Sequence, residues 1–276
     1  MGYASVMDTG EETGTVDELA PSSIGAGLST VFLGHQVVYY PVAASTNAVA
    51  SDMARHGAAD GTLVITDEQT AGRGRLDRSW FAPQGTSLLF SLLLRPRLPA
   101  RLAQQLTMLC GLGVRESVRQ CTGLPAQLKW PNDIMLGHRK AGGILTEVST
   151  LGERLEYAIV GIGLNVNLPT SALPAEFHAT SIAHECGHAV SRLQLLQHAL
   201  RSIEQRYVLL LAGQSPLAEW RAALDTLGQR VQIHSEQEQW EGLAIGVDDE
   251  GALLLRLDDG RTKRMLVGDI VSAHEH

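Results

Sequence analysis

The sequence predicts an α+β protein in which a domain of mixed helices and strands precedes a smaller all-β domain. Apolar runs at 62–66, 87–94 and 155–161 have the length and composition of buried strands. Apolar residues recur at helical spacing over 99–120 and 192–211. In the C-terminal segment, apolar and polar residues alternate in short stretches between turns that contain Asp and Gly, which is typical of a small barrel of short strands.

These patterns divide the chain into three expected parts. Residues 1–28 contain few large apolar residues and are expected to form a loose N-terminal arm. Residues 29–227 are expected to form the main domain, which opens with a strand pair over 31–42 broken at Gly34. Residues 228–276 are expected to form an SH3-like barrel.

The composition excludes several classes of protein. The 276 residues carry a net charge of −8, which is not the basic balance of a nucleic-acid binder, so any anion site must be a local cluster of Arg and Lys. No apolar run is long enough to span a membrane, and the N-terminus lacks the regions of a secretory signal. The three widely spaced cysteines indicate free thiols. We therefore expect a cytoplasmic protein with no nucleic-acid or membrane partner. The sequence leaves open whether it is a monomer or a homodimer.

The most informative segment is 69–80, which reads QTAGRGRLDRSW. It places two glycines, three arginines and a tryptophan in one short loop between two predicted strands. Glycine backbone and guanidinium groups can approach a phosphate closely, because glycine has no Cβ to hold the ligand away. Asp77 puts a carboxylate in the same loop. Taken alone, the segment fits an ordinary hairpin loop with solvated arginines equally well.

Three further sets of residues concentrate polar groups or glycines at turns. The Ser-Thr-Asn segment 45–47 precedes a helical pattern, so it can cap the helix, bind a polar ligand at the helix N-terminus, or do both. The Lys-Trp-Pro-Asn-Asp segment 129–133 brings an amide and a carboxylate to a tight corner. After Lys140, the glycines Gly142 and Gly143 allow the backbone to pack against a flat ligand. A β-hairpin with a solvated lysine explains this combination poorly.

Two familiar motifs have simpler explanations. The Gly-Ile-Gly segment 161–163 follows a strand, but a third glycine is missing and Pro169 blocks an immediate helix, so a dinucleotide-binding fold is not favoured. The segment 184–188 reads HECGH and matches a zinc-peptidase pattern, which needs both histidines on one continuous helix. Gly187 indicates a helix end there, and Ser191 indicates a new helix N-cap. We therefore expect no structural zinc.

In combination and in this order, the motifs resemble those of a biotin–protein ligase of the monofunctional type, over residue 30 to the end. The resemblance implies a mixed sheet with flanking helices, similar to class II aminoacyl-tRNA synthetases, followed by an SH3-like barrel. It implies activation of biotin by ATP as biotinyl-5′-AMP and transfer to a lysine of a biotin carboxyl-carrier domain of a biotin-dependent carboxylase. Asp77 departs from the family, which usually has Gly before the next Arg. The motifs that carry the resemblance are 45–47, 72–80, 129–133, 140–145 and 161–167.

The resemblance also implies roles for individual residues. Catalytic roles fall on Lys140, Arg75, Arg73 and Asp133, and Asp133 is expected to hold the Mg²⁺ that enters with ATP. Biotin is expected to contact Ser45, Thr46, Asn47, Gln69, Trp80, Gly142, Gly143, Leu145 and Gly163. The nucleotide is expected to contact Arg73, Arg75, Arg78, Trp80, Lys129, Asn132, Lys140 and Asn165.

Three alternatives remain open. A lipoate or octanoate ligase or transferase shares the main fold, but the Arg-Arg-x-x-Gly-Gly-Gly signature of that family is absent here. A non-catalytic sensor could hold biotin or biotinyl-AMP, although the presence of both Lys140 and the arginine-rich loop favours an enzyme. A zinc peptidase is the third alternative.

Overall fold

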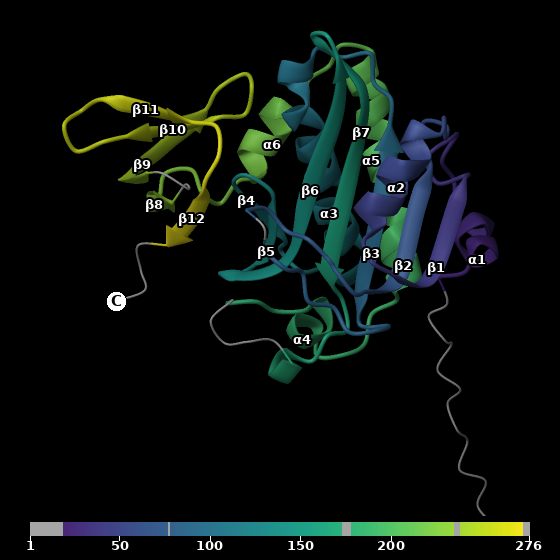
Figure 1. Ribbon diagram of the computed structural model, residues 1–276. Helices are drawn as coiled ribbons and strands as arrows, with labels where there is room; N and C mark the ends of the chain where they lie inside the picture. The colour runs from purple at the N-terminus through teal and green to yellow at the C-terminus, as the bar shows by residue number, and fades with distance from the viewer. Residues whose placement is uncertain (1–18, 77, 173–177, 235–237, 273–276) are drawn as a thin grey trace, which may run out of the picture.

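The computed structural model describes residues 19–76, 78–172, 178–234 and 238–272. A large sheet forms the centre of the molecule, and a small sheet lies beside it (Figure 1). This arrangement confirms the predicted α+β class and the separate C-terminal all-β unit. The strands of the large sheet, in the order β1-β2-β3-β7-β6-β5-β4, are β1 (Val37–Ala43), β2 (Leu63–Gln69), β3 (Ser87–Leu94), β7 (Arg154–Asn165), β6 (Arg139–Leu151), β5 (Asp133–Leu136) and β4 (Gln127–Lys129).

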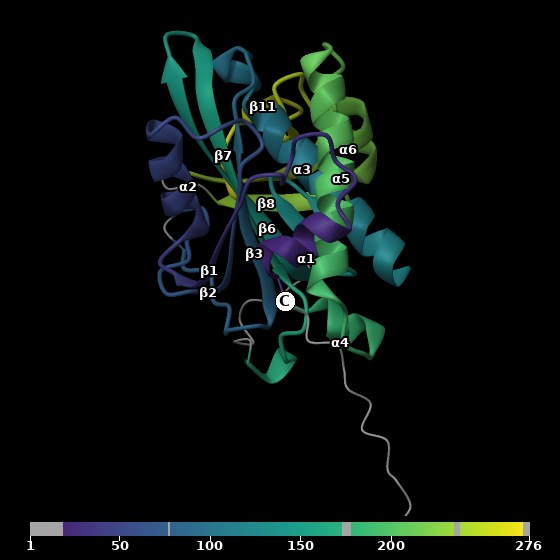
Figure 2. The same cartoon turned by 90° about the vertical axis from the view of Figure 1, so that its right-hand side faces the viewer.

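The large sheet is mixed and has helices on both faces. Strands β1 and β2 are parallel, and the other pairs are antiparallel. Figure 2 shows α2 on one side of the sheet and α3, α5 and α6 on the other. Among the described residues, the helices are α1 (Pro21–Ala26), α2 (Thr46–Arg55), α3 (Gln104–Thr122), α4 (Ile182–Cys186), α5 (Arg192–Leu211) and α6 (Leu217–Ala223), with short 3-10 turns at Ala100–Leu102 and Thr170–Ala172.

Strand β3 is buried along its whole length, as its unbroken apolar run predicts. Successive side chains of a strand point to opposite faces, so Leu92 packs into the core under α3 and α5 while Leu93 packs under α2. On the first of these faces, α3 and α5 approach closely because Gly113 has no side chain. A Cβ on Gly113 would lie 2.4 Å from Cγ1 of Ile203.

The predicted strand pair over 31–42 is wrong, because only β1 forms there. The reason lies in Glu204 of α5, which is 7% exposed. Its carboxylate accepts the backbone N–H groups of Val31, Phe32 and Leu33 at 2.6, 3.0 and 2.8 Å. These donors are therefore bonded to a distant glutamate and cannot join a strand ladder.

Residues 19–28 do not form the loose arm that the sequence predicts. Helix α1 forms within this stretch, and Leu19 and Ile24 are 2% and 0% exposed in the main core. Gln197 of α5 donates to the carbonyls of Ser23 and Ile24 at 3.1 and 3.0 Å, which fixes the end of α1. The rest of the expected arm, 1–18, lies outside the described residues.

The small sheet is antiparallel throughout and is attached to the main domain by hydrogen bonds. The indole Nε1 of the buried Trp130 donates to the carbonyl of Gly251 at 3.0 Å, and Arg221 donates to the carbonyl of Val247 at 2.6 Å. The small sheet is therefore docked close to the turn that joins β4 to β5. Its strands, in the order β11-β10-β9-β8-β12, are β11 (Thr262–Met265), β10 (Leu253–Arg256), β9 (Gln239–Val247), β8 (Arg230–His234) and β12 (Asp269–Ser272).

Candidate active site

One cavity of about 580 Å³ brings the sequence-predicted site residues together. It lies on the α2 face of the sheet, between the N-terminus of α2, the loop that follows β2, strands β6 and β7, and the start of β12. Gly142 does not line it. A Cβ on Gly142 would lie 2.9 Å from the carbonyl oxygen of Gly163, so this glycine permits close packing between β6 and β7. The predicted residues that line the cavity are Ser45, Thr46, Asn47, Gln69, Arg73, Arg75, Arg78, Trp80, Lys129, Asn132, Asp133, Lys140, Gly143, Leu145, Gly163 and Asn165.

The Gly-Ile-Gly motif of β7 forms the floor of this cavity. Residues two apart on a strand share a face, so Gly161 and Gly163 both face the cavity. The Oδ1 atom of Asn47 occupies the space above Gly161, where a Cβ would be 2.1 Å away. The indole of Trp80 lies above Gly163, where a Cβ would be 2.7 Å from Cε2. Each glycine therefore makes room for one specific side chain.

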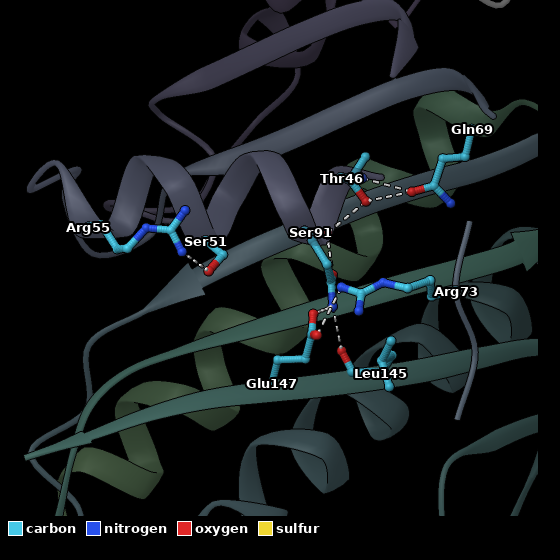
Figure 3. A network of polar contacts seen from close by, with 9 residues as sticks. Thr46, Ser51, Arg55, Gln69, Arg73, Ser91, Leu145 and Glu147 are labelled. Carbon is cyan, nitrogen blue, oxygen red and sulfur yellow. Dashed lines mark hydrogen bonds and ion pairs between the residues drawn. The ribbon is translucent and has the colours of Figure 1, made fainter. Parts of the chain in front are cut away.

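A row of polar groups lies at the N-terminus of α2, and Figure 3 shows it. Ser45 occupies the N-cap position, but its side chain makes no capping hydrogen bond. Instead, the backbone N–H of Thr46 donates to Oε1 of Gln69 at 2.8 Å. The Oγ atom of Ser91, on β3, lies 2.7 Å from both Oγ1 of Thr46 and Oδ1 of Asn47. The first turn of α2 is therefore bonded to two strands of the sheet.

Counting protons shows which polar groups of this row remain available to a ligand. Both Nδ2 hydrogens of Asn47 are used, because Nδ2 lies 2.6 Å from Oε2 of Glu147 and 3.3 Å from the carbonyl of Leu145, and both partners only accept. Oδ1 of Asn47 then accepts the single hydroxyl proton of Ser91. The same hydroxyl of Ser91 also points at Oγ1 of Thr46, whose own proton is directed at Oε1 of Gln69 at 3.2 Å. This leaves lone pairs on Oγ1 of Thr46 and hydrogens on Nε2 of Gln69 for a ligand.

Three cations at the other end of the cavity have carboxylate partners. Nζ of Lys140 lies 2.6 Å from Oδ1 of Asp133, across the β5–β6 pair. Arg78 lies 2.7 Å from Oδ2 of Asp269 on β12, and Arg75 lies 3.5 Å from Oδ1 of the same residue. Burial lowers the pKa of the Arg75 guanidinium, and the nearby Asp269 opposes that shift. An anionic ligand entering here exchanges these carboxylates for its own oxygens.

The start of β6 is clamped by residues 178–180. The backbone N–H of Lys140 donates to the carbonyl of His178 at 3.0 Å, and the N–H of Thr180 donates to the carbonyl of Lys140 at 2.8 Å. Nδ2 of Asn165 donates to the carbonyl of Thr180 at 3.0 Å. Oδ1 of Asn165, which is 4% exposed, has no hydrogen-bond partner among the described residues and is an acceptor available to a ligand. These bonds hold the backbone of Lys140 in register with the cavity floor.

The HECGH segment supports this clamp. Helix α4 ends at Cys186, and Gly187 is left-handed at φ 76°, which confirms the predicted helix end. Ser191 accepts the N–H of Gln194 and begins α5, as predicted. Glu185 accepts from Thr180 and pairs with Arg139 at 2.7 Å, so the glutamate of the motif braces the start of β6. Within the described ranges, no group of three or more His, Cys, Asp or Glu side chains is placed to hold a metal ion.

Among the residues that the sequence did not single out, Glu147, Ser91 and Asp269 matter for the polar contacts of the site. Glu147 lies two residues beyond Leu145 on β6, so strand alternation could have placed it on the same face. Ser91 is a lone hydroxyl within an apolar strand and could have been noticed for that reason. Asp269 comes from the small domain, and no local pattern marks it. Asp77 lies outside the described residues.

Comparison with known proteins agrees with this geometry. Residues 39–165 match the biotin/lipoate A/B protein ligase family, and residues 226–271 match the biotin protein ligase C-terminal domain. The chain is 36% identical over 257 residues to the bifunctional ligase/repressor BirA of Bacillus subtilis, covering 92% of this chain and 79% of that one. It is 35% identical over 224 residues to the biotin–[acetyl-CoA-carboxylase] ligase of Paracoccus denitrificans, covering 79% of this chain and 92% of that one.

A solved structure gives the same result. The biotin protein ligase from Aquifex aeolicus, in complex with biotin and ATP, superposes with a TM-score of 0.71 at 29% identity, over 86% of this chain and 98% of that one. Both domains are therefore shared with this family. The chain belongs to the biotin protein ligase family.

Proposed function

We propose that this chain activates biotin with ATP as biotinyl-5′-AMP and transfers the biotinyl group to a lysine of a biotin carboxyl-carrier domain. The observation that carries the proposal is the two-ended cavity. One end holds Lys140, Arg75 and Arg78, which suit phosphate, and the other holds the polar row at the N-terminus of α2, which suits an uncharged polar ring. The catalytic and binding roles below are proposals for individual residues.

Activation is needed because a free carboxylate is a poor acyl donor. A biotin carboxylate oxygen attacks the α-phosphorus of ATP, the bond from that phosphorus to the bridging oxygen breaks, and pyrophosphate leaves. Negative charge shifts among phosphate oxygens in this step, so fixed cations stabilise the transition state. Lys140 is placed to do this, because its backbone is clamped and Asp133 holds its ammonium group 2.6 Å away. Arg73, Arg75, Lys129 and Asn132 contribute further contacts to the adenylate.

Transfer follows when the neutral amine of an acceptor lysine attacks the mixed anhydride. The new amide C–N bond forms, the bond to phosphate breaks, AMP leaves, and the amine gives up a proton. The unperturbed pKa of lysine is about 10.4, so the neutral amine is scarce at neutral pH. The carboxylate of Asp133, at the turn between β4 and β5, is the group we propose to orient the incoming amine.

The biotin end is complementary to a ureido ring. Such a ring offers two N–H donors and one carbonyl acceptor. The lone pairs of Thr46 can accept from one N–H group of the ring, and the Nε2 hydrogens of Gln69 can be donated to the ring carbonyl. Trp80 over Gly163 supplies an apolar wall beside them, and Leu145 and Gly143 line the adjoining surface. A site whose polar groups must be paired rejects analogues that leave them unpaired.

The residues present fit Mg²⁺ as a companion of ATP. Asp133 is a single carboxylate next to the phosphate end, which suits an ion that keeps several waters and takes the rest of its ligands from phosphates. When bound with ATP, the ion would neutralise charge on the phosphate oxygens.

Transfer to two purified acceptors tests this function. We expect one biotinyl group on one lysine of an apo biotin-carrier domain, and no modification of a lipoyl domain supplied with lipoate. The opposite pattern would favour the lipoate alternative, and stable binding of biotin without any turnover would favour a sensor.

All three cysteines are free in the structure, which confirms the free thiols that their wide spacing predicts. Within the described residues no helix has the length and apolar character to cross a membrane. A cytoplasmic location, a monomer or homodimer, and the lack of a nucleic-acid partner remain proposals.

A further inference from the structure

Glu147 bonds to two segments of the chain that line the cavity. It lies on β6, and its two carboxylate oxygens contact different segments of the chain (Figure 3). Oε2 accepts from Nδ2 of Asn47 at 2.6 Å, at the N-terminus of α2. Oε1 accepts from the guanidinium of Arg73 at 3.0 Å, in the loop after β2. One side chain therefore connects the biotin end of the cavity to the segment 72–80, which we call the arginine loop.

The two contacts of Glu147 differ in strength. Asn47 is 4% exposed, and its amide is fully used by Glu147, Leu145 and Ser91, so this contact is a partly buried bond to a charged acceptor. The side chains of Arg73 and Glu147 are 53% and 38% exposed, so their ion pair is largely screened by water. Glu147 is therefore held at the Asn47 end, and Arg73 is the partner that can leave.

We propose that Glu147 is a positioning residue that fastens the arginine loop over the biotin end of the cavity through Arg73. This inference rests on the proposed function of the cavity. Because Glu147 and Asn47 are fixed by the sheet and by α2, the ion pair gives the loop a preferred position before any ligand arrives. A ligand then orders a loop that is already partly restrained, which lowers the entropy lost on binding.

The same pair makes closure reversible. A weak, exposed ion pair exchanges readily for a ligand oxygen, so Arg73 can turn to an anionic group when one is bound. Glu147 keeps its bond to Asn47 throughout this exchange, so the floor of the biotin end does not change. Opening and closing of the arginine loop therefore leave the hydrogen bonds at the biotin end of the cavity in place.

Glu147→Gln is the informative substitution. Gln keeps an oxygen that can accept the N–H of Asn47, but it removes the charge that attracts Arg73. Arg73→Gln removes the same ion pair from the other side and leaves every buried contact of Glu147 intact. The matched control is Glu156→Gln on β7, because Glu156 is an exposed strand carboxylate whose partner, Ser149 at 2.8 Å, lies outside the cavity lining.

Limited trypsin digestion of the ligand-free protein measures the position of the loop directly, since Arg75 and Arg78 are cleavage sites within it. We expect Glu147→Gln and Arg73→Gln each to raise the cleavage rate after these arginines by about two- to fivefold, the range of a weak ion pair. The double variant should equal either single variant, and Glu156→Gln should equal the unaltered protein. Melting temperatures should stay the same across this set, whereas Glu147→Ala, which leaves Asn47 unpaired, should melt lower.

Escape of the adenylate provides the second readout. Biotinyl-AMP formed without acceptor should leave Glu147→Gln faster by a similar factor. Cleavage and escape rates equal to those of the unaltered protein would overturn the proposal, as would effects of the two substitutions that add in the double variant. If neither the unaltered protein nor any variant forms an adenylate, the proposed function is wrong. The digestion result still decides the role of Glu147.

Discussion

Lys140 and Asp133 form an ion pair of 2.6 Å across neighbouring strands, and the ammonium lies 5.9 Å from the ring centroid of Trp80. The lysine is therefore held between a carboxylate and an aromatic wall before any substrate binds. Its backbone is fixed as well, by the segment 178–180. A cation restrained on three sides needs little reorganisation to meet a phosphate, which is the property expected of an electrostatic catalyst.

Lys140→Ala should abolish most adenylate formation while biotin still binds. Removing one well-placed donor to a charged transition state slows an enzyme by about 10²- to 10³-fold. Biotin-dependent pyrophosphate release measures the loss, and titration calorimetry measures biotin binding. Lys263→Ala is the control, because Lys263 lies over Trp240 in the small domain. Normal pyrophosphate release from Lys140→Ala would remove this residue from the mechanism.

Arg75→Gly should release the adenylate early, so that lysines are labelled without selection. Arg75 joins the arginine loop to the small domain, through contacts of 3.3 Å to the carbonyl of Gly268 and 3.5 Å to Asp269. Without these contacts the loop is left with the ion pair between Arg78 and Asp269 as its attachment to β12. Western analysis of biotin on a bystander protein mixed with the carrier domain measures the leak. A variant that labels only the carrier domain would show that Arg75 does not retain the adenylate.

Gly163→Ala should weaken biotin binding, because the added Cβ would lie 2.7 Å from Cε2 of Trp80 and must displace the indole. Overpacking of this kind costs about 1–3 kcal/mol. A biotin titration and urea unfolding separate the loss of affinity from the loss of stability. Gly246→Ala on β9 is the matched control, since a Cβ there meets nothing within 4 Å. If Gly163→Ala bound biotin normally, Trp80 would not form the wall of the biotin end.

Asp60 should give the stability of the protein a measurable pH dependence. Burial raises the pKa of Asp60 above its ordinary value of 3.8, although hydrogen bonds from Arg95 and Tyr207 oppose the shift. The folded state then binds the proton more tightly than the unfolded state does. The stabilisation from this group is present below pH 3.8 and is lost as pH rises through the raised pKa.

Asp60→Asn cannot titrate, so the free energy of unfolding of the unaltered protein should fall relative to this variant as pH rises from 3.8. Urea unfolding across that range measures the difference. A gap between the two proteins that stays constant with pH, or that changes in the opposite direction, would show that burial does not dominate at Asp60.

Local patterns predicted the elements whose structure depends on their own residues. The apolar run 87–94 is strand β3 with those bounds, and Ser191 begins α5 as its N-cap. The segment 31–42 was mispredicted because its backbone donors bind Glu204, which is more than 170 residues away in the chain. No local window contains that partner.

The residues of the site also divide into those that a local sequence pattern predicts and those that depend on contacts between distant segments. Motifs at chain turns identified Lys140 and the arginine loop, because those residues act through their own segments. The cavity floor needed the sheet register, which places Ser91 opposite Gly161, and Gly161 opposite Leu145. Asp269 needed the docking of the small domain, and a linear pattern does not encode that docking.

The retained small molecule is the most direct test of the central claim. The protein is incubated with biotin, MgATP and pyrophosphatase, without an acceptor, and is then passed through a desalting column and analysed by mass spectrometry. The account predicts biotinyl-AMP bound to the unaltered protein and little or none bound to Lys140→Ala. Recovery of unchanged biotin and ATP from the unaltered protein would contradict it.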